Sequence, residues 1–442
     1  MHRTIRPGRR STALAVAATL GACLLAGCAD DGGGGGSADA GEDAGGKKVV
    51  TVGVFGVFGY KQAGLYDEYE KLNPDVTIKE TSIERADQYF PQLLTHLGTG
   101  SGLQDIQAVE VGNVAETVNK HADKFVDLGS AEGVDKNNWL DWKAAQATTK
   151  DGKMIGLGTD IGPMAMCYRK DLFEKAGLPS DRDEVGKLWA GDWQKYLETG
   201  ERYMDKAPSG TVFTDSAAGL YNAALSSNVE RYYDKSGKLV YRDSPAVKEA
   251  WNLSMDAIEG KMTAKLKQFD KTWDQAYANG RFASVACPPW MLGYIKEKAG
   301  EKAADQWDVA PAPKPANWGG SFLTVPEAAK NKEEAIKLAA WLTAPEQQAK
   351  LFEKQASFPS SQAALELPAV ADAKHEYFGD APIGEIFGKA AENIPTLVLG
   401  EKDLAVGTAI TDIGILQVEQ QGKSPEEGWE AAVKNVDNLL DQ

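Results

Sequence analysis

Trp290 stands at a position where an aromatic side chain could stack on a ligand. It follows a helix that ends at Gly280, an apolar run over residues 282–287 and the pair Pro288-Pro289, so we expect a buried strand that stops abruptly with the indole at its end. An indole just beyond a strand end either packs in the core or faces a ligand in the crevice outside the sheet. Residues 279–291 by themselves leave both interpretations open.

No pattern of catalytic residues stands out in the chain. Its four histidines, at positions 2, 96, 121 and 375, are not spaced to share a face, and there is no phosphate-binding loop, dinucleotide fingerprint or Gly-x-Ser-x-Gly motif. Glu110 and Asp160 could serve glycoside hydrolysis if their carboxyl groups lay about 5 to 9 Å apart, but a chain with 64 acidic residues contains many chance pairs. We therefore expect a protein that is not an enzyme and that uses no metal and no cofactor.

The N-terminus has the composition of a bacterial export signal. Arginines at positions 3, 6, 9 and 10 precede an apolar run over residues 12–25, which is too short to span a bilayer comfortably. Leu25-Ala26-Gly27-Cys28 has the form of a lipobox, so we expect residues 1–27 to be a lipoprotein signal peptide and Cys28 to carry the lipid. A second candidate at Cys23 is poorer because it leaves a shorter apolar core, and Arg9-Arg10 keeps twin-arginine export open beside the general route.

The residues after the lipobox are too polar to fold. Residues 28–47 are rich in glycine and acidic side chains, which predicts a flexible tether between the membrane and the globular part. The formal net charge of the chain is −16 and is spread along the sequence, so nucleic acid is not expected as a partner.

Two cysteines, Cys167 and Cys287, remain after the lipobox. Outside the membrane such a pair can oxidise, and both residues lie at the ends of predicted strands. The residues alone allow a disulfide or two buried free thiols, and we favour the disulfide.

Strands and helices alternate in the first part of the globular chain. Apolar, β-branched runs predict strands over residues 49–55, 76–78 and 105–109, with helices over 62–72 and 88–97 between them. This order predicts a parallel sheet with helices on both faces. The glycine cluster at 98–102 follows a helix and lacks the lysine of a phosphate loop, so we interpret it as a turn.

Two turn-rich breaks predict crossings into and out of a second lobe. Residues 159–163 separate the predicted strands 154–158 and 164–168, and a proline-rich segment from Pro311 to Gly320 precedes a strand over 321–325. Helices dominate between the crossings. Capping signals mark three later helix starts, namely Ser244 with Pro245, Asn331 with Glu334, and Ser424 with Glu427.

Several motifs, in their order and spacing, resemble those of one family. These motifs are the lipobox, residues 168–179, residues 279–283 leading to Trp290, Trp318-Gly319-Gly320 and residues 341–347. With them the chain resembles the extracellular solute-binding proteins of carbohydrate ABC importers over essentially its whole length after the signal. Within that family it looks most like the cellobiose- and cello-oligosaccharide-binding lipoproteins of actinobacteria, to which Cys287-Pro288-Pro289-Trp290 and Cys167 are similar.

The resemblance implies an α/β fold of the two-lobed, periplasmic-binding-protein type (type II). Residues 48–158 and 318–358 would form the first lobe, and residues 159–317 and 359–442 the second. Hinges would lie near 158–163, 315–319 and 358–359, and the lobes would close on a sugar.

The same resemblance implies a site for sugar rings between the lobes. Aromatic faces stack on the C–H faces of a sugar, and polar side chains bind its hydroxyl groups. The expected stacking residues are Trp290, Trp318, Trp273, Tyr60 and Phe358. The expected polar contacts are Glu110, Asp160, Arg85, Gln88 and Ser321.

The function implied is capture of an oligosaccharide, expected to be cellobiose or cellotriose, and its delivery to the permease subunits of an ABC importer. We expect a monomer that is lipid-anchored on the outer face of the cell membrane. Two other interpretations stay open, a membrane-anchored glycoside hydrolase and a sugar-sensing lipoprotein that works with a signalling partner.

Overall fold

The computed structural model describes residues 46–440. The predicted signal peptide, the lipobox cysteine Cys28 and most of the predicted tether lie outside these residues. Within the described part, no helix is both long and apolar enough to cross a membrane.

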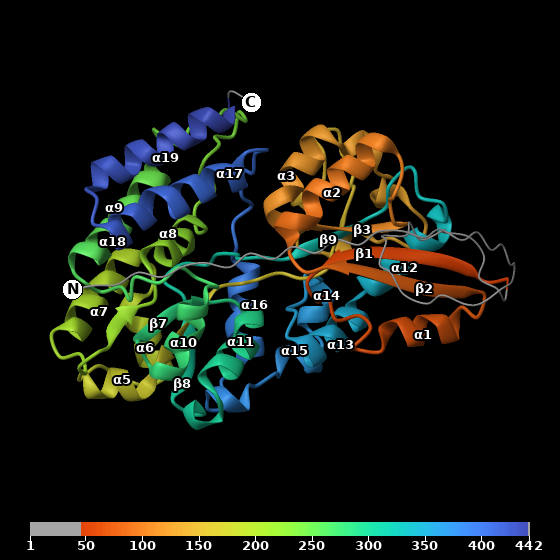
Figure 1. The fold of residues 1–442 in the computed structure, drawn as a ribbon. Helices are drawn as coiled ribbons and strands as arrows, with labels where there is room; N and C mark the ends of the chain where they lie inside the picture. Colours follow the sequence, from red (N-terminus) through yellow and green to blue (C-terminus); the bar gives the residue numbers. More distant parts are fainter. Residues whose placement is uncertain (1–45, 441–442) are drawn as a thin grey trace, which may run out of the picture. The chain divides into compact units, whose positions relative to one another are not determined.

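The first sheet has five strands in the order β2-β1-β3-β9-β4. β1 pairs in parallel with β2 and β3, whereas β9 runs antiparallel to β3 and β4. Helices cover both faces: α1 and α12 supply buried side chains to one core cluster, and α2 and α3 to another. Figure 1 shows these helices around the sheet. The strands are β1 Lys48–Phe55, β2 Val76–Ile83, β3 Ile106–Glu110, β4 Leu157–Gly158 and β9 Ser321–Thr324. The accompanying helices are α1 Leu65–Leu72, α2 Ala86–Thr99, α3 Val111–Lys120, α4 Asp141–Gln146, α12 Lys332–Leu342 and α13 Pro345–Gln355.

The second sheet has four strands in the order β6-β7-β5-β8. β5 is antiparallel to both β7 and β8, while β6 pairs in parallel with β7. Side chains alternate along β5: Met166 and Tyr168 enter one core cluster, and Ala165 and Cys167 enter the other. The strands are β5 Ala165–Arg169, β6 Val212–Thr214, β7 Phe282–Cys287 and β8 Trp307–Pro311.

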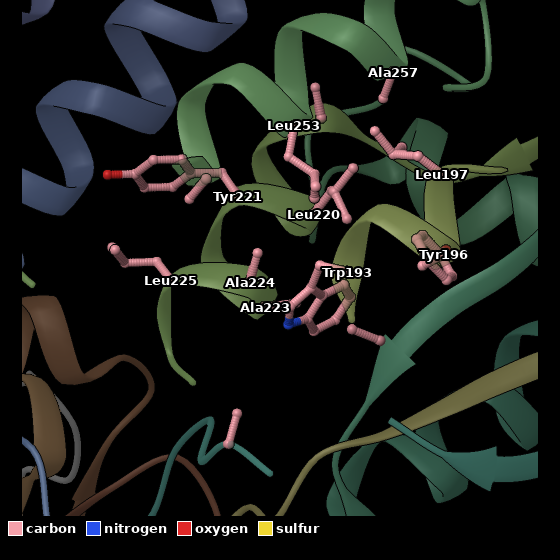
Figure 2. Packing of buried hydrophobic residues seen from close by; sticks show 14 of the residues in the cluster. Trp193, Tyr196, Leu197, Leu220, Tyr221, Ala223, Ala224, Leu225, Leu253 and Ala257 are labelled. Carbon is pink, nitrogen blue, oxygen red and sulfur yellow. The ribbon is translucent and has the colours of Figure 1, made fainter. Parts of the chain in front are cut away.

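Helices α7, α8 and α9 pack together over one face of the second sheet. Figure 2 shows this layer, in which Leu220 of α8 points toward Leu253 of α9, and Trp193 and Tyr196 come from α7. Tyr196 also donates or accepts a 2.8 Å hydrogen bond with Ser284 of β7, which fixes α7 on the sheet. The helices of this part and of the C-terminal region are α5 Lys170–Lys175, α6 Arg182–Trp189, α7 Trp193–Met204, α8 Ala217–Leu225, α9 Pro245–Glu259, α10 Lys271–Asn279, α11 Pro289–Ala299, α14 Gln362–Leu365, α15 Pro368–Ala371, α16 Ile383–Glu392, α17 Asp403–Thr408, α18 Leu416–Gln421 and α19 Pro425–Leu440.

A π-helix, η6 Ala409–Ile415, joins α17 to α18 without a break. Five short 3₁₀ turns complete the described elements, namely η1 Ala122–Lys124, η2 Leu128–Ser130, η3 Lys136–Asn138, η4 Glu301–Ala303 and η5 Glu376–Phe378.

The chain leaves the first sheet after β4 and returns to it at β9. The two connecting segments are hydrogen-bonded to each other, since Trp318 N–H donates to Gly162 O at 2.7 Å and Met164 N–H donates to Ala316 O at 2.9 Å. A third segment joins them, where Ile161 N–H donates to Phe358 O at 2.9 Å. The lobe boundaries at 158, 318 and 358 remain a prediction.

The predicted strand over residues 282–287 forms as β7, and Trp290 beyond its end is the second residue of α11, which Pro289 starts. The structure corrects two other expectations. The first sheet is mixed and not parallel, because β9, from later in the chain, joins it in the antiparallel direction. Asn331 makes no side-chain cap: its Nδ2 donates to Val49 O at 2.8 Å and so ties α12 to β1.

The other two helix starts form as predicted. Ser244 Oγ accepts from Val247 N–H, with Pro245 as the first residue of α9. Ser424 and Glu427 form a reciprocal capping box at the start of α19, with distances of 2.9 and 3.1 Å.

Candidate ligand-binding site

Two cavities meet at Trp318. We call them the inner cavity, of about 270 Å³, and the outer cavity, of about 440 Å³. Asn222, Trp318 and Thr411 line both of them, so the cavities adjoin and form one cleft. Glu110, Gln146, Arg231, Tyr232 and Asp403 also line the inner cavity, and Arg85, Ala218, Lys267, Gln268 and Phe269 the outer one.

The cleft is built from elements of both sheets. Glu110 is the last residue of β3 in the first sheet, and Asn222 lies on α8, which packs on the second sheet. Trp318 lies in the segment that connects β8 to β9. A ligand in the cleft would therefore touch both halves of the molecule and the connection between them.

Aromatic rings gather beside the outer cavity. Trp290 lies nearly parallel to Phe269, with ring centroids 6.3 Å apart and planes at 28°, and it meets Trp318 edge-on at 5.5 Å. Trp290 Nε1 also donates to the main-chain oxygen of Trp318 at 3.2 Å. Aromatic pairs of this kind contribute about 0.5 to 1.5 kcal/mol beyond their buried area. Phe269 and Trp318 line the cavity, and Trp290 packs against both.

Phe269 is held in an unfavourable conformation. Its φ is +67°, in the left-handed region, and its side chain is 51% exposed. The loop that carries it is anchored by Asp215, which is almost completely buried and whose Oδ2 accepts hydrogen bonds from Gln268 Nε2 and Trp273 Nε1, each at 2.8 Å. A strained, exposed aromatic residue on a firm anchor is typical of a binding site.

Three of the predicted site residues line the cleft. Trp318 borders both cavities, Glu110 the inner one and Arg85 the outer one. Arg85 is exposed and pairs with Asp87 at 2.7 Å. Gln88 is exposed on α2, three residues after Arg85, and lines neither cavity.

Other predicted residues belong to the core. Trp273, Tyr60 and Phe358 are each at most 1% exposed, and Ser321 is buried at the start of β9. The indole N–H of Trp273, its one side-chain donor, donates to Asp215. Phe358 packs edge-on against Phe352 and Phe387. Tyr60 belongs to a core cluster of the first sheet, and Trp273 and Phe358 belong to a core cluster of the second.

Glu110 has an unusual electrostatic environment. Burial raises the pKa of its carboxyl group from 4.5 to about 7. Two neighbours lower this pKa but do not outweigh burial: the Gly112 N–H, which donates to Oε2 at 2.6 Å, and the ammonium group of Lys143. Lys143 itself is fully buried over the ring of Phe322, and within residues 46–440 its ammonium group has no hydrogen-bond partner. Burial lowers the pKa of Lys143 to about 8, although Asp160 and Glu110 act in the opposite direction.

Asp160 links the two connecting segments to each other. Its Oδ1 accepts from Thr159 Oγ1 at 2.6 Å and from Ser321 N–H at 2.9 Å. The segments touch so closely that a Cβ at Gly162 would lie 1.9 Å from the Trp318 main-chain oxygen. The sequence prediction placed Asp160 at the crossing, and its hydrogen bonds there are to the protein itself.

Several residues of the cleft were missed by the sequence interpretation. Gln146, Arg231 and Asp403 come from positions far apart in the chain, and no motif unites them. Phe269 precedes a short helix and could have been noticed only as an apolar residue between Gln268 and Asp270. These contacts depend on tertiary structure that local patterns do not reveal.

Cys167 and Cys287 form a disulfide, with Cα atoms 5.7 Å apart. Both are fully buried in neighbouring strands, β5 and β7, and belong to the core cluster beneath α10 and α11. Because Trp290 follows Cys287 by three residues, the disulfide secures the start of α11.

Comparison with known proteins agrees with this architecture. A family of bacterial extracellular solute-binding proteins matches residues 64–378. A crystal structure of an extracellular solute-binding protein of family 1 is 40% identical and superposes with a TM-score of 0.82, over 88% of this chain and 99% of that one. The chain is also 26% identical over 300 residues to an arabinooligosaccharide-binding protein of Bacillus subtilis (strain 168), covering 64% of this chain and 66% of the relative, just under two thirds of its length. A maltooligosaccharide ABC transporter solute-binding lipoprotein of Streptococcus pneumoniae serotype 4 is 25% identical over 423 residues, covering 88% of each chain.

The chain belongs to the bacterial extracellular solute-binding proteins. The predicted fold class, the two-lobed α/β fold of periplasmic binding proteins, is confirmed. These relatives are solute-binding proteins and not enzymes.

Proposed function

We propose that this protein captures a neutral oligosaccharide in the cleft and delivers it to the permease subunits of an ABC importer. The observation that carries the proposal is the position of Trp318, whose side chain lines both cavities, together with the exposed ring of Phe269 in the outer one; both cavities are also lined by carboxyl, amide and guanidinium groups. An aromatic face and a set of polar groups are what a sugar ring needs, because its C–H faces are apolar and its rim carries hydroxyl groups. The names of the Bacillus and Streptococcus relatives point to the same class of ligand.

Cello-oligosaccharides such as cellobiose or cellotriose are our proposed ligands. A β-glucosyl unit carries its hydroxyl groups equatorially, so its ring faces are apolar and one of them can stack on Phe269 or on Trp318 in the wall of the outer cavity. Covering such a face removes apolar area from water, which contributes about 25 cal/mol of binding free energy per Å². The proposal of this particular sugar rests on the sequence resemblance described above.

We further propose that lipid on Cys28 anchors the protein outside the membrane, that residues 28–47 act as the tether, and that the protein works as a monomer. Capture would follow the usual scheme for two lobes: an open form admits the sugar, and closure excludes water and creates the form that docks on the permease. The connecting segments at 158–163 and 315–319 would provide the hinge, with lobes divided as predicted.

A thermal-shift screen tests this function. Cellotriose, maltotriose and arabinotriose would each be added to the purified protein, and a ligand at 100 times its dissociation constant stabilises the folded state by about 2.7 kcal/mol. We expect a clear rise in melting temperature with at least one trisaccharide and the largest with cellotriose. No shift with any oligosaccharide would argue for a different ligand class, and release of shorter sugars would favour the hydrolase interpretation.

Substituting Phe269 by asparagine separates binding from stability. Asparagine tolerates a positive φ better than phenylalanine does, so we expect the melting temperature of the sugar-free protein to stay the same or rise. Loss of the exposed ring should weaken trisaccharide binding about tenfold. A lower melting temperature with unchanged affinity would show instead that Phe269 is needed for packing.

Binding and stability should depend on pH in opposite directions. Burial raises the folded-state pKa values of Glu110 and Glu419 to about 7. Between about pH 4.5 and 7 the folded protein therefore holds protons that the unfolded chain releases. The free energy of unfolding should fall as the pH rises through this range. A sugar hydroxyl that donates to the Glu110 carboxylate needs its ionised form, so affinity should rise toward pH 7, by up to tenfold per unit. Titrations between pH 5 and 8 would measure this.

Glu419 supplies a matched control for this experiment. It is buried away from both cavities, where it accepts from Ala217 N–H at 2.9 Å. Glu419→Gln should flatten only the pH dependence of stability, whereas Glu110→Gln should flatten that of affinity as well. Equal effects of the two substitutions on affinity would rule out direct contact between Glu110 and the sugar.

A further inference from the structure

We propose that Gln146, Arg231 and Asp403 form a polar subsite in the inner cavity, which binds the hydroxyl groups of a neutral sugar unit next to the one that stacks on Phe269 and Trp318. This inference rests on the proposed function and deepens it. The shortest ligand that fills both subsites has two sugar units.

The first evidence is a set of unpartnered polar atoms. Within residues 46–440, Gln146 Nε2 and Oε1, Arg231 Nε and Asp403 Oδ1 are buried and have no hydrogen-bond partner. Gln146 is 7% exposed and Asp403 8% exposed, and both line the inner cavity. A buried polar group without a partner costs about 1 to 3 kcal/mol, and native proteins rarely leave several of them together. A polar ligand in the inner cavity would give these atoms hydrogen-bond partners.

The second evidence is that Asp403 and Arg231 lie next to each other with hydrogen-bonding atoms still unused. Asp403 Oδ2 accepts from Gly400 N–H at 2.9 Å, which leaves Oδ1 free for another donor. Arg231 Nη2 lies 3.6 Å from Asp403 Oδ2, close enough for attraction but not for a hydrogen bond, and its guanidinium lies over the ring of Tyr232. The Arg231 guanidinium, a donor, and Asp403 Oδ1, an acceptor, therefore lie side by side. Two hydroxyl groups on adjacent carbons of a sugar ring could bind to such a pair.

The wall of the inner cavity contains a rare backbone feature. Gly407 and Thr408 at the end of α17 and Thr411 in the π-helix η6 line this cavity, and Thr411 also borders the outer one. π-Helical turns occur frequently at functional sites, because the wider turn displaces side chains from the ordinary helical positions. Here the feature lies where the two subsites meet.

Charge defines the class of sugar that fits. The ionisable groups of the inner cavity are Glu110, Asp403 and Arg231, two acids and one base. A sugar acid would bring a further negative charge next to two carboxyl groups, whereas a neutral sugar can donate to them and accept from Arg231 and Gln146. We therefore infer that the inner subsite selects a neutral sugar unit over a uronic acid.

Gln146→Leu gives the sharpest test. The substitution replaces an unpartnered amide by an apolar group of similar shape, so the melting temperature of the sugar-free protein should stay the same or rise. Calorimetric titration with cellotriose should nevertheless show at least tenfold weaker binding, with glucose binding unchanged. A structural role for Gln146 predicts the reverse, a lower melting temperature with cellotriose affinity unchanged, and that result would overturn the subsite.

Asp403→Asn provides a second variant with a matched control. Asp308 is also a buried acid that faces an arginine, Arg182 at 3.0 Å, but it lies outside both cavities. We expect Asp403→Asn to weaken cellotriose binding at least tenfold and to reduce the preference for cellotriose over trigalacturonic acid, whereas Asp308→Asn should change neither. Equal cellotriose affinity in wild type and Asp403→Asn would contradict the polar subsite and would leave the proposed function unaffected. Failure of the wild-type protein to bind any neutral oligosaccharide would overturn the proposed function and the subsite together.

Discussion

Trp318→Ala should weaken trisaccharide binding by at least about 30-fold, which corresponds to about 2 kcal/mol. Trp318 is an aromatic side chain that borders both cavities, and its position is fixed by the 2.7 Å hydrogen bond from its N–H to Gly162 O. Its removal would take away a stacking face in the wall of both subsites. Isothermal titration of the wild type and the variant with cellotriose would measure the loss.

Trp429 is the matched control for this substitution. It is also a half-buried tryptophan, but it packs on Trp251 in the C-terminal region, with ring centroids 5.1 Å apart, and does not line the cleft. Trp429→Ala should lower the melting temperature and leave the affinity unchanged. If Trp318→Ala behaved in the same way, its indole would be a packing residue of the crossing and not a ligand contact.

Loss of the disulfide should have the second large effect, this time mainly on stability. Cys167 and Cys287 are 120 residues apart in sequence, and a bond that closes so long a loop typically stabilises the folded state by about 2 to 4 kcal/mol. We expect the double substitution Cys167→Ala with Cys287→Ala to lower the free energy of unfolding by this amount. Urea denaturation of the variant and of the oxidised wild type would measure the difference.

The disulfide should also influence binding, through α11. It holds the end of β7 directly before Pro288, Pro289 and Trp290, and Trp290 supports Phe269 and Trp318. Reduced protein that is still folded should therefore bind cellotriose more weakly than oxidised protein. Unchanged binding after reduction would restrict the disulfide to a role in stability.

Much of the fold followed from local patterns in the sequence. The β-branched run that becomes β1, the serine and proline that start α9, and the capping box of α19 act through neighbouring residues, so the sequence was sufficient to predict them. Strand direction was not predictable in this way. β9 joins the first sheet from more than 200 residues beyond β3, and its antiparallel pairing depends on the tertiary fold.

The site was predictable where it lies beside a local break. Glu110 ends a strand and Trp318 lies in a crossing, which is where clefts of α/β proteins form. The same rule also selected Trp273, whose ring the structure encloses, because sequence does not show which side of a short helix is covered. Arg231 and Asp403 meet only through the packing of the C-terminal helices, and no local pattern marked them.

Equilibrium binding of labelled cellotriose, followed by analysis of the recovered sugar, distinguishes reversible capture from hydrolysis. We expect saturation at one sugar per protein molecule, with the trisaccharide recovered intact after long incubation. Cellotriose converted to glucose or cellobiose, or an absence of saturable binding to any neutral oligosaccharide, would contradict the proposed function.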